Sequence, residues 1–274
     1  MRDGTSDDFL KLMQDVADFR PSFDETNAAS AVQPARIARG AMRPSLICFP
    51  SFVGKSDVYQ YARFAAGFRG IRDVSVLPHP GFLAGELLPA STEALLRAYA
   101  SAVQKCADGA PFVLVGYSVG GLVAHAVAAH LETVGLTPAA VVLIDTYSSE
   151  DVETWREAKR GLEQTMMDRN DDTGDASRGD SWVTAMARYF TFDWWDMVET
   201  AAPTLLVRAT DPVSEVPEDV EWNVSFRFAR TVTMLAAPGN HFTLIRERAA
   251  STAQMINDWL TASSTDLPPG HAAH

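Results

Sequence analysis

The stretch from Pro111 to Leu122, PFVLVGYSVGGL, constrains the fold of this chain more than any other. Residues 112–115 form a short apolar run between a proline and a glycine, which is typical of a buried strand. The pattern G-x-S-x-G follows at residues 116–120, and apolar residues then recur at helical spacing. This order predicts a nucleophile elbow, a sharp strand–helix turn that holds the Ser118 hydroxyl out over a sheet. The alternative is a glycine-rich turn in which Ser118 only caps the helix.

Length and composition limit the class of protein. With 274 residues, of which 47% are hydrophobic, the chain can bury one sizeable core, and α/β folds of this length are commonly one domain. The formal net charge of −12 argues against a nucleic-acid partner, whose phosphates would repel it. Cys48 and Cys106 form no CxxC pair, so neither a disulfide scaffold nor a zinc site is expected.

The sequence predicts no association with a membrane. No apolar run reaches the roughly 18 residues that a spanning helix needs. The first residues, MRDGTSDDF, are acidic and lack the apolar centre of a signal peptide. We therefore expect a cytoplasmic protein.

Strands and helices alternate over residues 45–260. The alternation predicts a mostly parallel sheet with helices on both faces. We expect strands at Ser45–Phe49, Val74–Leu77, Phe112–Val115, Ala140–Ile144, Thr204–Arg208 and Val232–Leu235. Helices are expected at Val58–Phe68, from a Ser91 cap to about Cys106, after Ser118, and at Glu247–Leu260.

The two ends of the chain stand apart from this pattern. Residues 1–44 hold an amphipathic helix at Ser6–Arg20, ended by Pro21, and then a polar stretch over Ser22–Pro44 that we expect to be structureless. The apolar face of the helix packs either on its own domain or on a partner subunit. Residues 261–274 are expected to form a disordered tail.

The alternation also breaks at about residues 146–200, too long a segment for an ordinary connection, so we expect an inserted substructure. It is rich in aromatic residues and methionine, which suits a helical lid over an apolar substrate, although ordinary packing explains it too. Its acidic part, residues 168–180, fails as a calcium loop. Thr173 and Gly179 stand where the turn glycine and the bidentate glutamate belong, so we expect a mobile surface loop.

A serine nucleophile needs a base, and the base needs an acid that orients it. Among the six histidines His241 is the best base, because it follows the last strand at the edge of the sheet where the elbow lies. His79 lies in a loop that could also approach. Asp145 and Asp211 each end a strand at that edge. Either gives the chain order Ser…Asp…His of an α/β-hydrolase, so both remain open at this point.

Two backbone N–H groups should form an oxyanion hole, since they are rigid donors aimed where negative charge develops. One is the N–H of Val119, directly after the nucleophile. The other should come from the loop after the first core strand, near Ser51 or Phe52.

Together these motifs resemble the thioesterase domain that terminates modular polyketide synthases, with relatives in nonribosomal peptide synthetases. The resemblance runs from about Ser6 to Leu260. It is carried by LICFPS at residues 46–51, PFVLVGYSVGGL at 111–122, VVLIDTY at 141–147, PTLLVRA at 203–209 and PGNHFTL at 238–244.

The resemblance implies roles for several residues. It makes Asp145 rather than Asp211 the acid, and it places the second oxyanion donor at about Phe52. It also implies a dimer through the N-terminal helix and a helical lid over a substrate channel. The chain departs from the family at Tyr117, where histidine is common, and in the bulky loop of residues 49–52.

The expected activity is release of a polyketide acyl chain from the phosphopantetheine arm of an acyl carrier protein. The chain would pass to Ser118 and leave by hydrolysis or macrolactonisation. No metal or organic cofactor is expected. The alternatives are a stand-alone editing thioesterase, which would favour Asp211 as the acid, a small-molecule esterase, and a non-catalytic binding module on the same fold.

Overall fold

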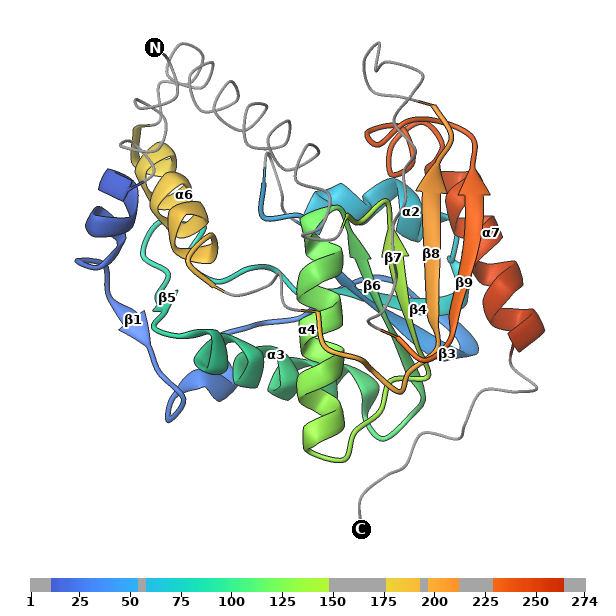
Figure 1. Ribbon diagram of the computed structural model, residues 1–274, viewed down its shortest axis with the longest axis horizontal. Helices are drawn as coiled ribbons and strands as arrows, with labels where there is room; N and C mark the ends of the chain where they lie inside the picture. The colour runs from blue at the N-terminus through green and yellow to red at the C-terminus, as the bar shows by residue number, and fades with distance from the viewer. Residues whose placement is uncertain (1–10, 54–57, 148–175, 193–196, 212–228, 264–274) are drawn as a thin grey trace.

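A seven-stranded sheet forms the centre of the computed structural model, which describes residues 11–53, 58–147, 176–192, 197–211 and 229–263 (Figure 1). The strand order is β2-β4-β3-β6-β7-β8-β9, and only the edge pair β2–β4 is antiparallel. The predicted, mostly parallel sheet is therefore confirmed. The strands are β2 Ala35–Ala38, β3 Gly40–Phe49, β4 Gly70–Val76, β6 Phe112–Tyr117, β7 Ala140–Ile144, β8 Thr204–Ala209 and β9 Val232–Ala237.

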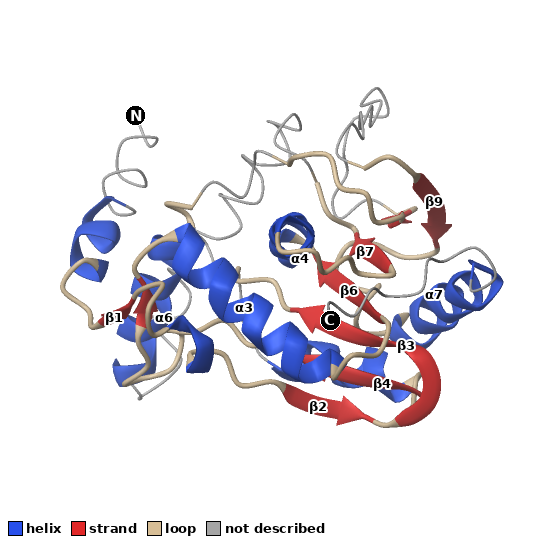
Figure 2. Cartoon of the chain, turned by 90° about the horizontal axis from the view of Figure 1, so that it is seen from below, coloured by secondary structure: helices blue, strands red, loops and turns tan. Residues whose placement is uncertain are grey.

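Helices cover both faces of this sheet, as the alternation predicts. Figure 2 shows α3 and α4 on one side of the strands and α7 on the other, where α2 packs against it. The predicted Ser91 cap is confirmed, because the Ser91 side chain accepts the N–H of Ala94. The helices are η2 Val58–Tyr61, α2 Ala62–Ala66, α3 Thr92–Ala107, α4 Val119–Thr133, α6 Ala176–Tyr189 and α7 Ala249–Ser263.

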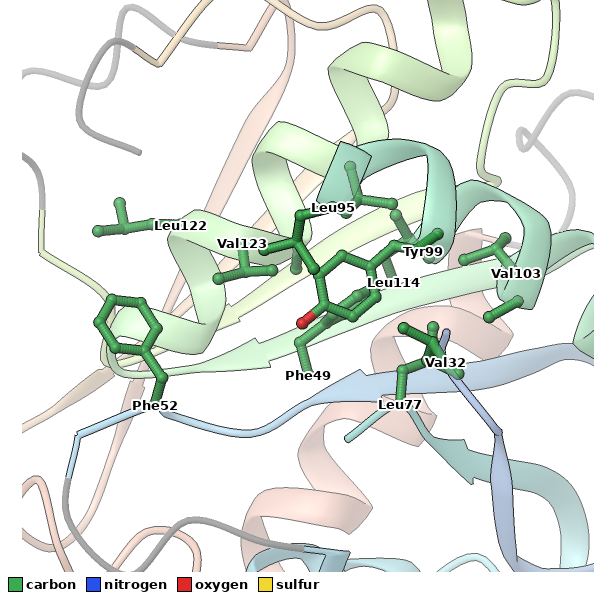
Figure 3. Close-up of a cluster of buried hydrophobic side chains, with 14 of the residues drawn as sticks. Val32, Phe49, Phe52, Leu77, Leu95, Tyr99, Val103, Leu114, Leu122 and Val123 are labelled. Atoms are coloured by element: carbon green, nitrogen blue, oxygen red, sulfur yellow. The ribbon is translucent and has the colours of Figure 1, made fainter. Parts of the chain in front are cut away.

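Alternating side chains of the central strands divide between two apolar layers. On β6, Leu114 faces α3 and α4, whereas Val113 and Val115 face α2 and α7. Figure 3 shows Leu114 in the layer between the sheet and helices α3 and α4, with Tyr99 of α3 and Val123 of α4. Because successive strand residues point to opposite faces, an unbroken apolar run is what a sheet covered on both sides requires.

The stretch from Ser22 to Pro44 is not structureless, and that expectation was wrong. It forms β1 (Ser22–Phe23), the short helix η1 (Ala28–Ser30), β2 and the first half of β3. Strand β1 pairs with β5 (Leu88–Pro89), and β2 pairs with β4. These backbone partners are far away in the sequence, so the local pattern of Ser22–Pro44 carries no sign of them.

The N-terminal helix is described from residue 11, and residues 11–17 are helical. Leu12, Val16 and Phe19 are 54%, 41% and 90% exposed. The Arg20 guanidinium donates to the carbonyl of Ser181 on α6 at 2.8 Å and to that of Gly81 at 2.8 Å. The segment therefore packs on its own domain through one side and leaves an apolar face exposed, beside α6 in Figure 1.

Two further expectations need correction or lie outside the described part. Most of the 146–200 insertion lies outside it, but residues 176–180 of the expected acidic loop form the start of α6.

At the C-terminus, α7 continues three residues past the expected boundary. Thr261 bonds the Asn257 carbonyl at 2.7 Å, and its hydroxyl oxygen accepts a 3.3 Å bond from buried Arg72. The rest of the predicted tail, residues 264–274, lies outside the description.

Candidate active site

Ser118 lies on the sharp turn between β6 and α4, with backbone angles φ 56° and ψ −133°. A residue other than glycine with positive φ is strained by roughly 1–3 kcal/mol, so the surrounding structure must hold it. Its N–H donates to the Ile144 carbonyl at 2.9 Å, and its carbonyl accepts the Thr146 hydroxyl at 3.0 Å. The Ser118 side chain makes no capping hydrogen bond to α4, so the capping alternative does not describe this serine.

Three glycines make this turn sterically feasible. A Cβ on Gly116 would lie 2.3 Å from the Gly120 carbonyl oxygen, and one on Gly121 would lie 1.9 Å from the Thr146 hydroxyl. A Cβ on Gly120 would lie 2.4 Å from the carbonyl oxygens of both residues 49 and 50. The elbow thus packs directly on the loop after β7 and on the loop after β3.

Ser118, His241 and Asp145 form one chain of hydrogen bonds. His241 Nε2 lies 3.1 Å from Ser118 Oγ, and His241 Nδ1 lies 2.8 Å from Asp145 Oδ2. The three residues follow β6, β9 and β7, whose carboxyl ends meet at one edge of the parallel sheet. A carboxylate can only accept, so Nδ1 carries the proton and Nε2 is left to accept the serine proton.

Of the two candidate acids, only Asp145 contacts His241 in the described structure. Its side chain is buried, and the Ala209 N–H donates to Oδ1 at 3.0 Å. Burial raises the pKa of Asp145. The hydrogen bond from His241 and its charge outweigh this effect, together with the Ala209 N–H and the charge of Arg208, and they hold the pKa below its ordinary value. Asp211 is exposed and accepts the Thr210 hydroxyl instead.

Two tyrosines support the triad, and the sequence analysis gave neither of them a role. The Tyr117 ring stacks on the His241 ring at 5.0 Å and 28°, and its hydroxyl donates to the His241 carbonyl at 2.9 Å. The Tyr147 hydroxyl donates to Asp145 Oδ2 at 2.9 Å. The Arg208 guanidinium lies over the Tyr147 ring, 4.5 Å from the ring centroid. The only sign of Tyr117 in the sequence was its departure from the family's histidine. Tyr147 stood unremarked within a motif.

His79 does not approach the serine, although it lies close to the loop after β3. Its Nε2 lies 2.7 Å from the Pro50 carbonyl, and its Nδ1 bonds the Tyr99 hydroxyl. Burial lowers the pKa of His79 to about 4, against an opposing effect of the bond to Pro50. The imidazole is therefore neutral near pH 7 and donates to Pro50 through Nε2.

The two predicted oxyanion donors lie at the start of α4 and in the loop after β3. Val119 is the first residue of α4, and N–H groups in a first helical turn have no partner within the helix. The Ser51 N–H donates to Gln60 Oε1 at 2.8 Å. At Ser51, one of the two positions predicted on this loop, the amide is therefore bonded within the domain.

Other kinds of site receive no support from the described residues. Within those ranges, no group of three or more His, Cys, Asp or Glu side chains could hold a metal ion. None of the helices in the same ranges is long and apolar enough to cross a membrane.

Comparison with known proteins gives a consistent set of relatives. The model of the family "Thioesterase domain" matches residues 44–260. The chain is 45% identical over 94% of its length to the spectinabilin polyketide synthase system protein NorC of Streptomyces orinoci, and it covers 11% of that protein. It is 34% identical over 92% of its length to the erythronolide synthase EryA3 of Saccharopolyspora erythraea, and it covers 8% of it. The chain thus spans about a tenth of these relatives.

Solved structures show the same fold at low sequence identity. The Vlm2 thioesterase domain superposes with a TM-score of 0.60 at 18% identity, over 82% of this chain and 96% of that one. The thioesterase domain SrfTE, described for cyclization of the lipopeptide surfactin, superposes with a TM-score of 0.55 at 18% identity, over 86% and 97%. These likenesses bear on the fold, which is of the α/β-hydrolase type.

Proposed function

This chain belongs to the thioesterase-domain family, and we propose that it is the chain-releasing domain of a polyketide synthase, acting as a serine hydrolase through an acyl-enzyme. The observation that carries the proposal is the hydrogen-bonded chain Ser118–His241–Asp145, with links of 3.1 and 2.8 Å. The substrate is a polyketide acyl thioester, and the partner that delivers it is an acyl carrier protein.

In the first half of the reaction the acyl chain moves onto the enzyme. His241 Nε2 takes the Ser118 proton while Ser118 Oγ forms a bond to the thioester carbonyl carbon. The carbonyl oxygen becomes an oxyanion, held by the N–H groups of Val119 and Phe52. The C–S bond then breaks, the acyl group stays on Ser118, and the phosphopantetheine sulfur leaves with the proton from His241.

In the second half His241 takes a proton from a new nucleophile, which forms a bond to the ester carbonyl carbon. The bond between that carbon and Ser118 Oγ then breaks, and Oγ takes the proton from His241. Water gives a linear acid, and a hydroxyl of the same acyl chain gives a macrolactone. Asp145 keeps the imidazole in the required tautomer in both halves and stabilises its charged form. No cofactor takes part in this scheme.

The inserted segment 146–200 acts as a lid in this proposal. The contacts of α6 support it, because Tyr189 packs on Phe52 of the predicted oxyanion loop, with ring centroids 5.5 Å apart, and Phe190 packs at 5.4 Å. Aromatic residues at that place suit an apolar acyl chain and limit the access of water.

The N-terminal helical segment acts as a dimer element in this proposal, whereas residues 35–44 belong to the central sheet of the catalytic domain, as β2 and the first half of β3. Three exposed apolar side chains support this: Leu12 and Val16, one helical turn apart, and Phe19 in the turn that follows the helix. We expect a dimer by sedimentation equilibrium and a monomer for Leu12→Glu combined with Phe19→Glu, whereas Lys11→Glu should stay dimeric. A monomeric wild type would contradict the dimer and favour the stand-alone editing thioesterase.

The activity is tested with hydroxyacyl thioesters of N-acetylcysteamine and product analysis by mass spectrometry. We expect turnover by the wild type and none by Ser118→Ala, which should unfold at nearly the same temperature. A fluorophosphonate should label the wild type at Ser118 and leave the variant unlabelled. A ring product, one water lighter than the acid, would identify a cyclase. A wild type that is neither active nor labelled would refute the serine mechanism and favour a binding module.

A further inference from the structure

We infer that Gln60, Tyr61 and His79 are positioning residues that hold the oxyanion loop, residues 49–52, so that the Phe52 amide faces the nucleophile. The inference rests on the proposed function, because it assumes that the Phe52 N–H stabilises an oxyanion. None of the hydrogen bonds that these three residues make within the described ranges goes to Ser118, His241 or Asp145.

Side chains from outside the loop hold its consecutive backbone polar groups. The Tyr61 hydroxyl donates to the Phe49 carbonyl at 2.9 Å, and His79 Nε2 donates to the Pro50 carbonyl at 2.7 Å. The Ser51 N–H donates to Gln60 Oε1 at 2.8 Å. The peptide between Pro50 and Ser51 is thus held at both its carbonyl and its amide, directly before the peptide whose N–H belongs to Phe52.

The groups that hold the loop are themselves fixed. Tyr61 and His79 are buried, and the Tyr99 hydroxyl bonds His79 Nδ1, which sets the tautomer that donates to Pro50. The His79 ring also packs against Tyr189 at 5.4 Å. Buried, hydrogen-bonded side chains have few alternative rotamers, so they transmit a defined position to the loop.

The position of this loop matters because it touches the elbow. The carbonyl oxygens of Phe49 and Pro50 both lie 2.4 Å from where a Cβ on Gly120 would be, so the loop and the start of α4 are in close contact. Figure 3 shows Phe52 beside the first turn of α4, near Leu122. If either carbonyl moves, the Phe52 amide moves relative to Ser118, and the oxyanion hole loses its geometry.

The consequence for catalysis is specific. An oxyanion donor acts on the tetrahedral intermediate and hardly on the bound substrate, so its misplacement lowers kcat and leaves KM nearly unchanged. Complete loss of one donor costs about 10²–10³ in kcat. Loss of one of several supports should cost less, about 10-fold to 100-fold.

Gln60 offers the cleanest test, because it is only half-buried and its replacement need not unfold the domain. Gln60→Met keeps the length of the side chain and removes the acceptor for the Ser51 N–H, whereas Gln60→Glu keeps an acceptor there. We expect kcat for a thioester to fall about 10-fold to 100-fold in Gln60→Met, with KM within about twofold. Gln60→Glu should retain most of the activity. Arg63→Met, which makes the same kind of change at an exposed residue of α2, is the matched surface control.

A second readout separates positioning from a general structural role. In a dithioester the developing negative charge falls on sulfur, which accepts hydrogen bonds weakly, so the oxyanion hole contributes less. The ratio of wild-type to Gln60→Met kcat should therefore be several-fold smaller for the dithioester than for the thioester.

The outcomes are distinct. If the wild type is active and Gln60→Met has the same kcat, this inference alone is overturned. The same holds if kcat falls equally on the thioester and the dithioester, or if only KM changes. A wild type that turns over no thioester and is not labelled at Ser118 would instead overturn the proposed function.

Discussion

The buried imidazole of His79 should make the stability of this domain depend on pH below neutrality. Burial lowers the pKa of His79 from 6.5 to about 4 in the folded protein. Between these values the unfolded chain binds a proton that the folded protein does not, so stability is fully present above pH 6.5 and is lost as the pH falls toward 4. One pKa unit corresponds to about 1.4 kcal/mol, so the loss should reach roughly 2.5 kcal/mol at pH 4.5.

The assay is urea unfolding, followed by tryptophan fluorescence, at pH values from 7.5 to 4.5. The comparison is with His79→Gln, which keeps a side-chain donor toward Pro50 and cannot titrate in this range. Other groups titrate in both proteins, so the difference between the two curves isolates His79. We expect the free energy of unfolding to fall by about 2.5 kcal/mol more in the wild type than in the variant. Curves that stay parallel to within about 0.5 kcal/mol would refute the assignment of a buried, neutral His79.

Three further predictions follow from the site. Gly116→Ala should lower the free energy of unfolding by roughly 3 kcal/mol, because the added Cβ meets the backbone of α4. Gly135→Ala is the control: its Cβ enters open space, and only the positive φ of +78° should cost about 1 kcal/mol. Similar urea midpoints for the two variants would contradict this. In thioester assays, Asp145→Asn should lower kcat by a factor of about 10⁴, and Asp211→Asn should lower it by less than about twofold. The reverse pattern would make Asp211 the acid. Tyr147→Phe removes a hydrogen bond to Asp145, so it should lower kcat for a thioester several-fold, far less than Asp145→Asn does. A kcat equal to that of the wild type would show that this bond does not help to hold the acid.

The strongest local patterns predicted their elements well. The apolar run before Ser118 became β6, the run ending in Asp145 became β7 over Ala140–Ile144, and the Ser91 cap begins α3. Each of these signals lies within one element and reflects burial on both faces of a sheet or a capping contact a few residues away. The Ser22–Pro44 stretch was misjudged because its strands exist only through pairing with distant β4 and β5.

The candidate triad could be predicted as residue types and positions, since parallel strands bring Ser118, Asp145 and His241 to one edge of the sheet. The sequence left the choice between Asp145 and Asp211 to a family resemblance. The structure brings Asp145 to 2.8 Å from His241 and leaves Asp211 exposed. That choice depends on side-chain geometry at the strand ends, which no linear pattern encodes.

By itself the sequence determined the order of the main strands after residue 44, the elbow and the set of groups available for catalysis, because these depend on local periodicity, turn chemistry and residue type. Only the tertiary structure decided what surrounds them. It stacks Tyr117 on His241, and it brings Gln60 and His79 to the amide and the carbonyl of one peptide in the loop after β3. These contacts join residues from different elements, so they arise only when packing brings those elements together.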